Sequence, residues 1–325
     1  MTLKHKLSIL LVFLLTLGCS AEQTPDPQKK MLPTSPYLVV LGIAQDAGYP
    51  QANCKKGCCE SAWENSALRR HASCIALVDP RSGKRWLFEA TPDIKNQLSM
   101  LDDWTETSSQ NIVDGIFLTH AHIGHYTGLM HVGREVMGTT NLPVFAMPRM
   151  RNFLRTNGPW SQLVELQNVQ LKNLRADSTI QLEKDLSVTP VQVPHRDEFS
   201  ETVGFIIRSE QRSALFLPDI DKWEKWQRNI EDILRTVDVA YVDATFYANG
   251  EIPGRDMALI PHPFVEESMK RFAILPDDEK EKIHFIHLNH TNPMLQPNSS
   301  ARKQVLSNGY EIAEEGEIFI LMSDE

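Results

Sequence analysis

The sequence lacks three features that would each indicate a different class of protein: an excess of basic residues, a long apolar run and internal repeats. Asp and Glu outnumber Lys and Arg by 42 to 33, a formal net charge of −9. A nucleic-acid-binding surface normally shows the opposite excess, so we expect no nucleic-acid partner. The charge does not exclude a small phosphorylated substrate, because a bound metal ion can reverse the local potential.

The apolar run near the N-terminus, Leu7–Leu17, is too short to cross a membrane comfortably, because a spanning helix needs roughly 20 residues. It follows Lys4 and Lys6 and ends at the small residue Gly18. A basic start, an apolar stretch and small residues at the end are typical of a secretory signal. We therefore predict that residues 1–18 are a signal peptide and that the protein is exported.

The next residue is Cys19, in the sequence Thr16-Leu-Gly-Cys19. This segment resembles a bacterial lipoprotein cleavage site, in which the cysteine is acylated, although Leu is usual where Thr16 stands. The resemblance implies a periplasmic protein anchored to the inner or outer membrane through a lipid on Cys19; the alternative is plain secretion with cleavage nearby. Residues 19–36, with four prolines among polar residues, are predicted to be a flexible tether, and residues 37–325 the folded domain.

Short β-rich runs dominate the rest of the chain, and most are bounded by Gly, Pro, Asp or Asn, as strands usually are. The predicted strands are Tyr37–Ile43, Cys74–Val78, Trp86–Glu89, Ile112–Leu118, Leu186–Val193, Val203–Ile207, Ala214–Leu217, Val237–Val242, Ile283–Leu288 and Ile318–Leu321. Helical patterns lie at Ile94–Leu101, Gly128–Val136, Trp223–Leu234 and Phe264–Phe272. The mixture of elements predicts two sheets with helices outside them, in one α/β domain.

Three histidines lie close together in the sequence His120-Ala-His122-Ile-Gly-His125. The preceding segment, Val113–Thr119, has the pattern of a buried strand, so the histidines are expected at the end of that strand and on the turn into a helix. Three imidazoles held there can converge on one or two divalent ions. Imidazole binds zinc, iron, nickel and manganese to differing degrees, so the spacing predicts a metal centre without identifying the metal.

Other metal-binding side chains follow other predicted strands. His195, Asp219 and His287 each come at or just after the end of an apolar run. Because this arrangement repeats that of the histidine cluster, we expect the three residues to supply the remaining ligands. Asp221, two residues after Asp219, is expected to cap the following helix instead.

Several segments carry a resemblance to a known family. The histidine cluster is similar to the signature His-x-His-x-Asp-His of the metallo-β-lactamase-fold superfamily, whose other ligands are a distant His, Asp and His. Within it, the sequence resembles the pyrroloquinoline-quinone biosynthesis protein B group and, more distantly, the phosphonate-operon cyclic phosphodiesterase and the tRNA 3′-processing endonucleases. The likeness covers roughly residues 37–321 and rests further on Gly42–Cys54, Leu87–Leu98, Asp243–Phe246, Gly254–Met257 and His287–Pro293.

The resemblance implies an αββα sandwich of two mixed β-sheets flanked by helices, with a metal site at one end. The implied ligands of a first ion are His120, His122 and His195, and those of a second are His125, Asp219 and His287, with the Asp219 carboxylate bridging. One position departs from the family, because the signature Asp falls on Gly124. This substitution predicts a site that lacks one carboxylate ligand of the second ion and a group that orients the attacking hydroxide.

The remaining cysteines have two interpretations. Cys54, Cys58 and Cys59 lie in a segment that resembles the Cys-x-Cys-x-x-Cys zinc turn of these relatives, whose fourth ligand falls on His290. Cys54 and Cys59 match directly, whereas Cys58 would replace the middle cysteine after a shift of the loop. A structural zinc site with three Cys and one His is chemically sound, but an oxidising compartment also permits disulfides such as Cys54–Cys74.

The preferred function is that of a metal-dependent hydrolase acting on a phosphodiester or another ester-like small molecule. Zinc, manganese or iron would lower the pKa of a bound water to about 7, and the metal-bound hydroxide would be the nucleophile. Asp243 is predicted either to orient a ligand histidine or to cap a loop. Arg255 and His262 are predicted to bind an anionic group of the substrate.

The alternative function is oxidative. With Gly124 in place of the signature Asp, a single iron with open positions would suit a non-haem oxygenase, and the protein B group is regarded as hydroxylating tyrosine in a peptide-derived precursor. An exported lipoprotein would be badly placed for a cytoplasmic biosynthetic pathway, which favours hydrolysis. A third interpretation is a metal-binding module without catalysis. The sequence identifies neither the substrate nor the oligomeric state.

Overall fold

The structure is a computed structural model that describes residues 32–105 and 112–322. The predicted signal peptide, Cys19 and most of the predicted tether lie outside the described residues. Pro33–Glu325 form one compact unit. Among the described residues, no helix is both long enough and apolar enough to cross a membrane.

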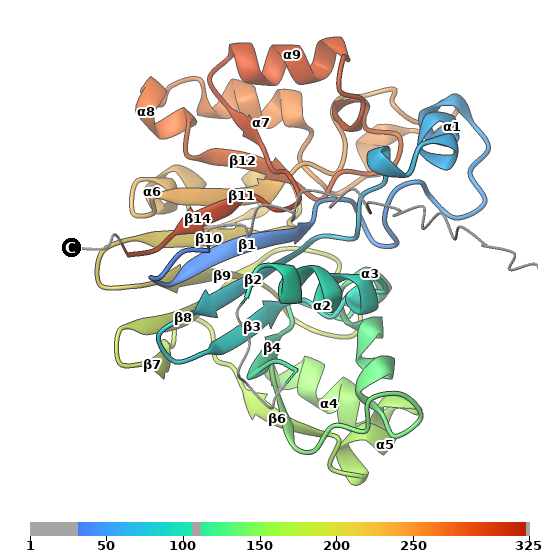
Figure 1. Cartoon of the computed structure of the whole chain (residues 1–325). Coiled ribbons are helices and arrows are strands. Elements are labelled where there is room, and N and C mark those ends of the chain that lie inside the picture. Colours follow the sequence, from blue (N-terminus) through green and yellow to red (C-terminus); the bar gives the residue numbers. More distant parts are fainter. Residues whose placement is uncertain (1–31, 106–111, 323–325) are drawn as a thin grey trace, which may run out of the picture. The chain divides into compact units, whose positions relative to one another are not determined.

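The strands of the described residues form two seven-stranded sheets (Figure 1). The first sheet has the order β14 (Ile318–Ile320), β1 (Tyr37–Gly42), β2 (Cys74–Asp79), β3 (Lys84–Phe88), β4 (Gly115–Phe117), β5 (Leu142–Ala146) and β6 (Val169–Asn173). The second has the order β13 (Glu311–Ile312), β12 (Ile283–Ile286), β11 (Val239–Asp243), β10 (Ser213–Leu217), β9 (Thr202–Arg208), β8 (Leu186–Val193) and β7 (Ile180–Glu183). Both sheets are mixed, with parallel pairing from β3 to β6 and from β10 to β13.

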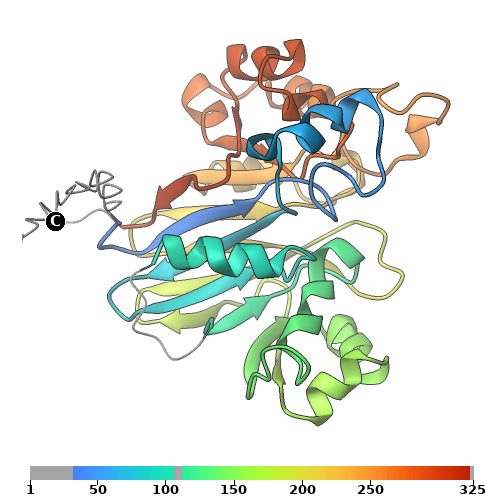
Figure 2. The same cartoon turned by 45° about the vertical axis from the view of Figure 1, so that its right-hand side comes forward.

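Helices cover the outer face of each sheet (Figures 1 and 2). Those packed on the first sheet are α2 (Ile94–Asp103), α4 (Pro148–Thr156) and α5 (Trp160–Glu165); those on the second are α6 (Ile230–Leu234), α7 (Val265–Phe272) and α9 (Ser300–Ser307). The other elements are α1 (Gly57–Glu64), α3 (Ile123–Tyr126), α8 (Asp277–Lys280) and the 3₁₀ turns η1 (Ser66–Leu68), η2 (Thr127–Val132), η3 (Trp223–Lys225), η4 (Met257–Leu259) and η5 (Pro293–Leu295). The layers confirm the predicted αββα sandwich.

The first sheet is buried on both faces, and the sequence of β1 shows why. Leu38 and Val40 belong to the core between the sheets, whereas Tyr37, Val39 and Leu41 belong to the core beneath the outer helices. Successive side chains of a strand point to opposite faces. A strand that is covered on both faces therefore needs apolar residues at every position, and β1 has them.

Phenylalanine side chains fill the space between the sheets. Phe88, Phe117 and Phe145 are register partners on three neighbouring strands, and their rings stack with centroids 5.0 and 4.3 Å apart. Phe205 of β9 meets the first two rings edge-on at 5.5 and 5.6 Å. Such pairs stabilise a protein by about 0.5–1.5 kcal/mol beyond the burial of their area. They fix the two sheets relative to each other next to the segment that carries His120.

Strand direction brings the ends of several strands to one edge of the sandwich. β1 and β3 both pair antiparallel with β2, and β4 is parallel to β3, so these three strands run the same way. In the second sheet β8 and β10 both pair antiparallel with β9, and β11 and β12 are parallel to β10. The segments that follow these strands carry the predicted ligands.

Each predicted strand corresponds to an observed strand, but some elements were not predicted. Strands β5, β6 and β7 are among those that were not predicted. β6 and β7 carry polar residues on partly exposed positions, and β5 contains Pro143, so none of the three has the pattern of a buried strand. The single helix predicted at Trp223–Leu234 is wrong: η3 and α6 are separated because Trp226 donates to Gln192 O and Arg228 pairs with Asp177. The helix predicted at Gly128–Val136 is instead the 3₁₀ turn η2 followed by turns.

Gly42 ends β1 where the chain passes directly over the backbone of residues 71 and 72. A Cβ there would collide with the carbonyl oxygen of Ala72 and lie 2.8 Å from that of His71. We expect Gly42→Ala to lower the free energy of unfolding by about 1–3 kcal/mol, because overpacking a close contact forces the backbone to shift. At Gly57, the exposed first residue of α1, an added Cβ meets nothing within 4 Å, so Gly57→Ala is the matched control. Urea unfolding measures both, and equal effects would contradict this account.

Candidate metal centre

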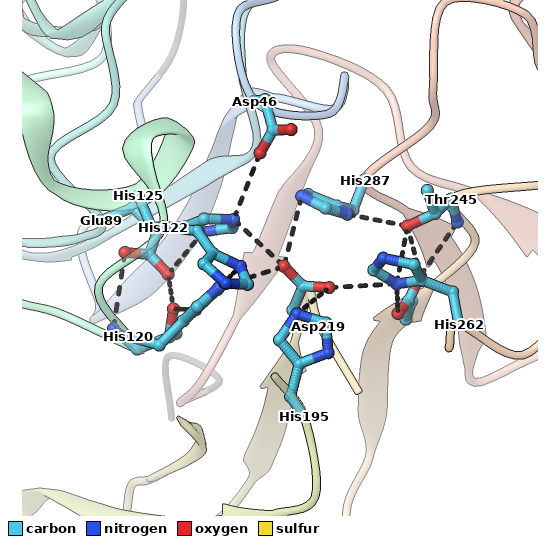
Figure 3. Close-up of polar contacts among 12 residues, drawn as sticks. Asp46, Glu89, His120, His122, His125, His195, Asp219, Thr245, His262 and His287 are labelled. Atoms are coloured by element: carbon cyan, nitrogen blue, oxygen red, sulfur yellow. Dashed lines mark hydrogen bonds and ion pairs between the residues drawn. The ribbon is translucent and has the colours of Figure 1, made fainter. Parts of the chain in front are cut away.

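Five histidines and one aspartate from both sheets converge at the shared edge (Figure 3). His120 and His122 follow β4, His125 belongs to α3, His195 follows β8, Asp219 follows β10 and His287 follows β12. All six predicted ligands therefore lie together, as the strand directions require.

The carboxylate of Asp219 lies at the centre of this cluster. Its Oδ2 atom is 3.4 Å from His120 Nε2 and 3.2 Å from His125 Nε2. The same oxygen is 3.8 Å from His287 Nε2, and Oδ1 is 3.5 Å from His195 Nε2. Three groups at this site have donor atoms within 4.8 Å of one another: His120, His122, His195 and Asp219; Asp46, His125 and His287; and Asp219, Asp243 and His262. The Asp219 carboxylate also lies 3.2 and 3.8 Å from His125 and His287 of the second group.

Three of the ring nitrogens that face Asp219 have no well-aligned partner among the described residues, whereas His120 Nε2 lies 2.9 Å from His122 Nδ1. Within residues 32–105 and 112–322, Nε2 of His125, His195 and His287 is buried and makes no hydrogen bond of acceptable geometry. An unpaired buried polar atom costs about 1–3 kcal/mol, so three in one place need a physical reason. Divalent ions bound between these atoms would satisfy them, because imidazole nitrogen and carboxylate oxygen are ordinary ligands of zinc, iron and manganese. The residues therefore fit a divalent-metal centre.

Neighbouring side chains hold the opposite ring nitrogen of four of these histidines. Thr119 Oγ1 lies 2.9 Å from His120 Nδ1, Glu89 Oε1 3.2 Å from His125 Nδ1, Asp221 Oδ1 3.2 Å from His195 Nδ1, and Thr245 Oγ1 3.0 Å from His287 Nδ1. Partners of this kind fix the tautomer and the orientation of a metal-binding histidine. In each case the Nε2 atom is left facing the centre of the cluster.

The prediction that Asp221 caps a helix is wrong. Asp221 contacts His195 and accepts a hydrogen bond of 2.9 Å from Lys225 Nζ, whereas the N-cap of η3 is Lys222, with no side-chain cap. The reason is a contact between two segments that are distant in the sequence: the backbone N–H of Asp221 donates to the carbonyl of Pro194 at 2.7 Å. That bond holds the aspartate beside the histidine that follows Pro194.

Burial favours the neutral, metal-binding form of three of the predicted histidine ligands. It lowers the pKa of His120, His122 and His287, so these rings are neutral at pH 7 and keep a lone pair for an ion. Burial would raise the pKa of Asp219, but its interactions with the surrounding imidazoles, with that of His195 first, lower it well below its usual range. Asp219 is therefore an anion in the folded chain.

Glu89 and His125 form a second buried pair of titratable groups. Burial raises the pKa of Glu89, which also accepts a hydrogen bond from Thr119 Oγ1. Burial would lower the pKa of His125, but the carboxylates of Glu89 and Asp219 raise it well above its usual value. Glu89 is 0% exposed, and its contacts with this imidazole and with the Thr119 hydroxyl offset the cost of burying the carboxyl group.

His262, predicted to bind a substrate anion, is buried inside the site. Its Nδ1 atom lies 2.8 Å from Asp243 Oδ2 and 3.1 Å from Asp219 Oδ1. Burial would lower the pKa of His262, but these two carboxylates raise it to about 10. Arg255, the other predicted substrate residue, is exposed, and no contact within the described ranges joins its guanidinium to the cluster.

Asp243 has both of the roles predicted for it. Its Oδ1 atom accepts a hydrogen bond of 2.7 Å from Thr245 Oγ1, the hydroxyl that faces His287. Its Oδ2 atom accepts the backbone N–H of Ile220 at 3.0 Å. One carboxylate thus supports a ligand histidine through a threonine and fixes the loop that carries Asp219.

Sequence reasoning missed four residues of the site: Asp46, Glu89, Thr119 and Thr245. Each lies within a few residues of the end of a predicted strand, and all but Thr119 belong to segments that carry the family resemblance, which was the available signal. Asp46, Glu89 and His287 adopt φ angles of 47°, 93° and 68°. Non-glycine residues rarely adopt such angles, and they concentrate at functional sites.

The cysteine segment brings together most of its predicted ligands. Cys54 Sγ lies 3.7 Å from Cys58 Sγ, and donor atoms of Cys54, Cys58 and His290 lie within 4.8 Å of one another. Cys59 is buried beside them; burial first, then its two cysteine neighbours, raises the pKa of its thiol to about 12. These three cysteines and Cys74 are free, so the alternative disulfide between Cys54 and Cys74 is not formed.

A family model for the Beta-lactamase superfamily domain matches residues 84–313. The chain belongs to the beta-lactamase superfamily. This result confirms the family that the sequence motifs indicated.

Relatives in the superfamily are similar over most of this chain. The coenzyme PQQ synthesis protein B of Methylorubrum extorquens strain PA1 is 24% identical over 306 residues, covering 86% of this chain and 98% of that protein. The same protein of Methylococcus capsulatus is 26% identical over 309 residues, covering 85% and 97%. The zinc-bound PqqB structure from Methylobacterium extorquens has a TM-score of 0.72 at 23% identity, covering 87% and 99%. A diphosphatase of the PhnP family has a TM-score of 0.60 at 20% identity, covering 87% and 96%.

We expect the cysteine segment to hold a zinc ion independently of the histidine site. Cys54→Ser should reduce the zinc content by one ion per chain and leave the ions of the histidine site in place, because a thiolate ligand is lost. Cys74→Ala removes a buried thiol in β2, away from the segment, and is the matched control. Elemental analysis of the purified protein measures both, and an unchanged zinc content in Cys54→Ser would refute the zinc site.

Proposed function

We propose that this protein is a metal-dependent hydrolase that cleaves a phosphodiester or another ester-like bond in a small molecule. The observation that carries the proposal is the position of Asp219, whose carboxylate lies 3.2–3.8 Å from Nε2 atoms of both sets of histidines: His120 and His195 in one, and His125 and His287 in the other. Membership of the beta-lactamase superfamily supports it. So does the structural likeness to a diphosphatase of the PhnP family and to human tRNase Z, with TM-scores of 0.60 and 0.54.

The ligand sets assign a role to each residue. His120, His122 and His195 would hold one ion, and His125 and His287 the other, with Asp219 between them. Zinc, manganese or iron bound there would lower the pKa of a water to about 7 and polarise an ester or phosphoryl oxygen. Thr119, Glu89, Asp221 and Thr245 would keep the rings in one orientation, so that the ligand geometry is set before substrate binds.

His262 would protonate the leaving group. Its Nδ1 atom is held by Asp243 and Asp219, and none of the contacts in the described part of the chain uses its Nε2 atom. Hydrolysis breaks the bond to the leaving oxygen, and a poor leaving group needs a proton as that bond breaks. A histidine kept cationic by two buried carboxylates can supply that proton.

A cavity beside the His122 side of the site would receive part of the substrate. Its volume is about 420 Å³, and Arg149, Phe153, Glu198 and Phe199 are among the residues that line it. Glu198 Oε2 lies 3.5 Å from His122 Nε2, and the rings of Phe153 and Phe199 are 5.6 Å apart. Since Phe199 is 59% exposed, its ring is available to a flat or apolar group of a small substrate.

The second candidate function is oxygenation, and it is favoured by the similarity to coenzyme PQQ synthesis protein B over 86% of this chain. An oxygenase of this kind would use one iron with open coordination positions. The two donor sets that meet at Asp219 favour two ions and therefore hydrolysis. The number of ions and the consumption of oxygen distinguish the two functions.

We also propose that the protein is exported and anchored to a membrane by a lipid on Cys19. The proposal rests on the basic and apolar sequence of residues 1–18 and on Thr16-Leu-Gly-Cys19. Cell fractionation tests it, and recovery of the protein in the cytoplasm would refute it.

The test of hydrolysis is turnover of bis-p-nitrophenyl phosphate and of a β-lactam by protein loaded with Mn, Zn or Fe. We expect phosphodiester turnover with two ions in the histidine site. His195→Ala should lower it at least about 100-fold, because even residues that only support a ligand cost 10–100-fold. His131→Ala, outside the cluster, is the control. A single iron with oxygen consumption would replace hydrolysis by oxygenation, and full activity in His195→Ala would overturn the site.

The proposed role of His262 predicts that its loss affects substrates with a poor leaving group most. His262→Gln should lower the turnover of a phosphodiester with an alkyl alcohol leaving group by about 10²–10⁴-fold, the usual contribution of a general acid. Turnover of bis-p-nitrophenyl phosphate should fall much less, since p-nitrophenolate leaves without a proton. The comparison of kcat for the two substrates measures the effect, with Arg255→Gln as the control. Equal losses on both substrates would contradict proton donation by His262.

A further inference from the structure

Gly124 stands where the metallo-β-lactamase-fold signature has an aspartate, and the structure shows what occupies that space. A Cβ atom added to Gly124 would collide with the Cα atom of Asp46 and lie 2.5 Å from its Oδ1 atom. The side chain that position 124 lacks would therefore point into the volume that Asp46 fills. No side chain at position 124 is compatible with the present position of Asp46.

The Asp46 carboxylate faces the second set of histidines (Figure 3). Its Oδ1 atom lies 3.8 Å from His125 Nε2, and Asp46, His125 and His287 form a group whose donor atoms lie within 4.8 Å of one another. His125 and His287 each contribute a buried Nε2 atom that no well-aligned hydrogen bond satisfies within residues 32–105 and 112–322. The group thus contains two unsatisfied imidazole nitrogens and one carboxylate.

Backbone hydrogen bonds fix the turn that carries Asp46. The N–H of Leu288 donates to the carbonyl of Ile43 at 2.8 Å, and the N–H of Gln45 donates to the carbonyl of Leu288 at 2.9 Å. Leu288 directly follows His287, so these bonds hold Asp46 and His287 at a constant separation. Asp46 itself has φ 47°, an angle that Asp tolerates better than most residues.

We propose that Asp46 supplies, from the turn after β1, the carboxylate ligand that the family signature supplies from position 124. The second ion would then be held by Asp46, His125 and His287 together with the bridging Asp219. The site is not one carboxylate short, as Gly124 alone would imply, because the ligand has moved to another segment of the chain. This inference rests on the two-ion site of the proposed function.

The inference is tested by counting ions and not by activity. Asp46→Asn should lose one metal ion per chain, with at least about 10–100-fold weaker binding of that ion, the loss typical of residues that support a ligand. Gly124→Asp alone should fold poorly, because its Cβ has no room beside the Asp46 backbone.

Elemental analysis and calorimetric titration with Mn²⁺ or Zn²⁺ measure these effects, and thermal unfolding shows which variants are folded. Asp278→Asn, on the exposed surface of α8, is the matched control for loss of one carboxylate. The proposal is overturned if Asp46→Asn is folded and keeps every ion. Absence of hydrolysis in a native chain that binds two ions would count against the proposed function and leave the assignment of Asp46 intact.

Discussion

The carboxylate of Asp219 is the constraint on which the rest of the site depends. It is buried among histidines that come from both sheets, and an isolated buried anion would be strongly unfavourable. The histidines and the ions that they can hold offset this cost. Asp219 follows β10, between β9 and β11 in the second sheet, so the carboxylate cannot be displaced without disturbing the sandwich itself.

The support around the ligands follows from the same architecture. Glu89 and Thr119 come from the ends of β3 and β4, and Asp221 and Thr245 from the segments after β10 and β11. Each reaches the Nδ1 side of a ring whose Nε2 side faces the centre. Ligands and supports are thus built on adjacent strand ends, which is why two sheets with a common edge can fix a geometry that loops alone would not.

The sequence predicted those residues of the site that follow a recognisable apolar strand. Three histidines after a buried strand, and His195, Asp219 and His287 after others, predicted the residues that converge in the structure, because apolar runs and the ends of strands can be recognised in the sequence. It did not predict contacts between segments distant in the chain. Asp221 looked like a helix cap because the hydrogen bond from its N–H to Pro194 is not visible in the sequence. Asp46 was missed because only the folded chain shows that Gly124 makes room for it.

The backbone bonds between the turn after β1 and Leu288 also determine when the site can exist. They join a segment near the start of the domain to one near its end, and the ligands are distributed along the chain between them. If the centre holds a second ion as proposed, a ribosome must release nearly the whole domain before that ion can meet its ligands. Contacts so distant in sequence slow folding. Uptake of that ion would be a late event, one that reports completion of the fold and distinguishes finished chains from truncated ones.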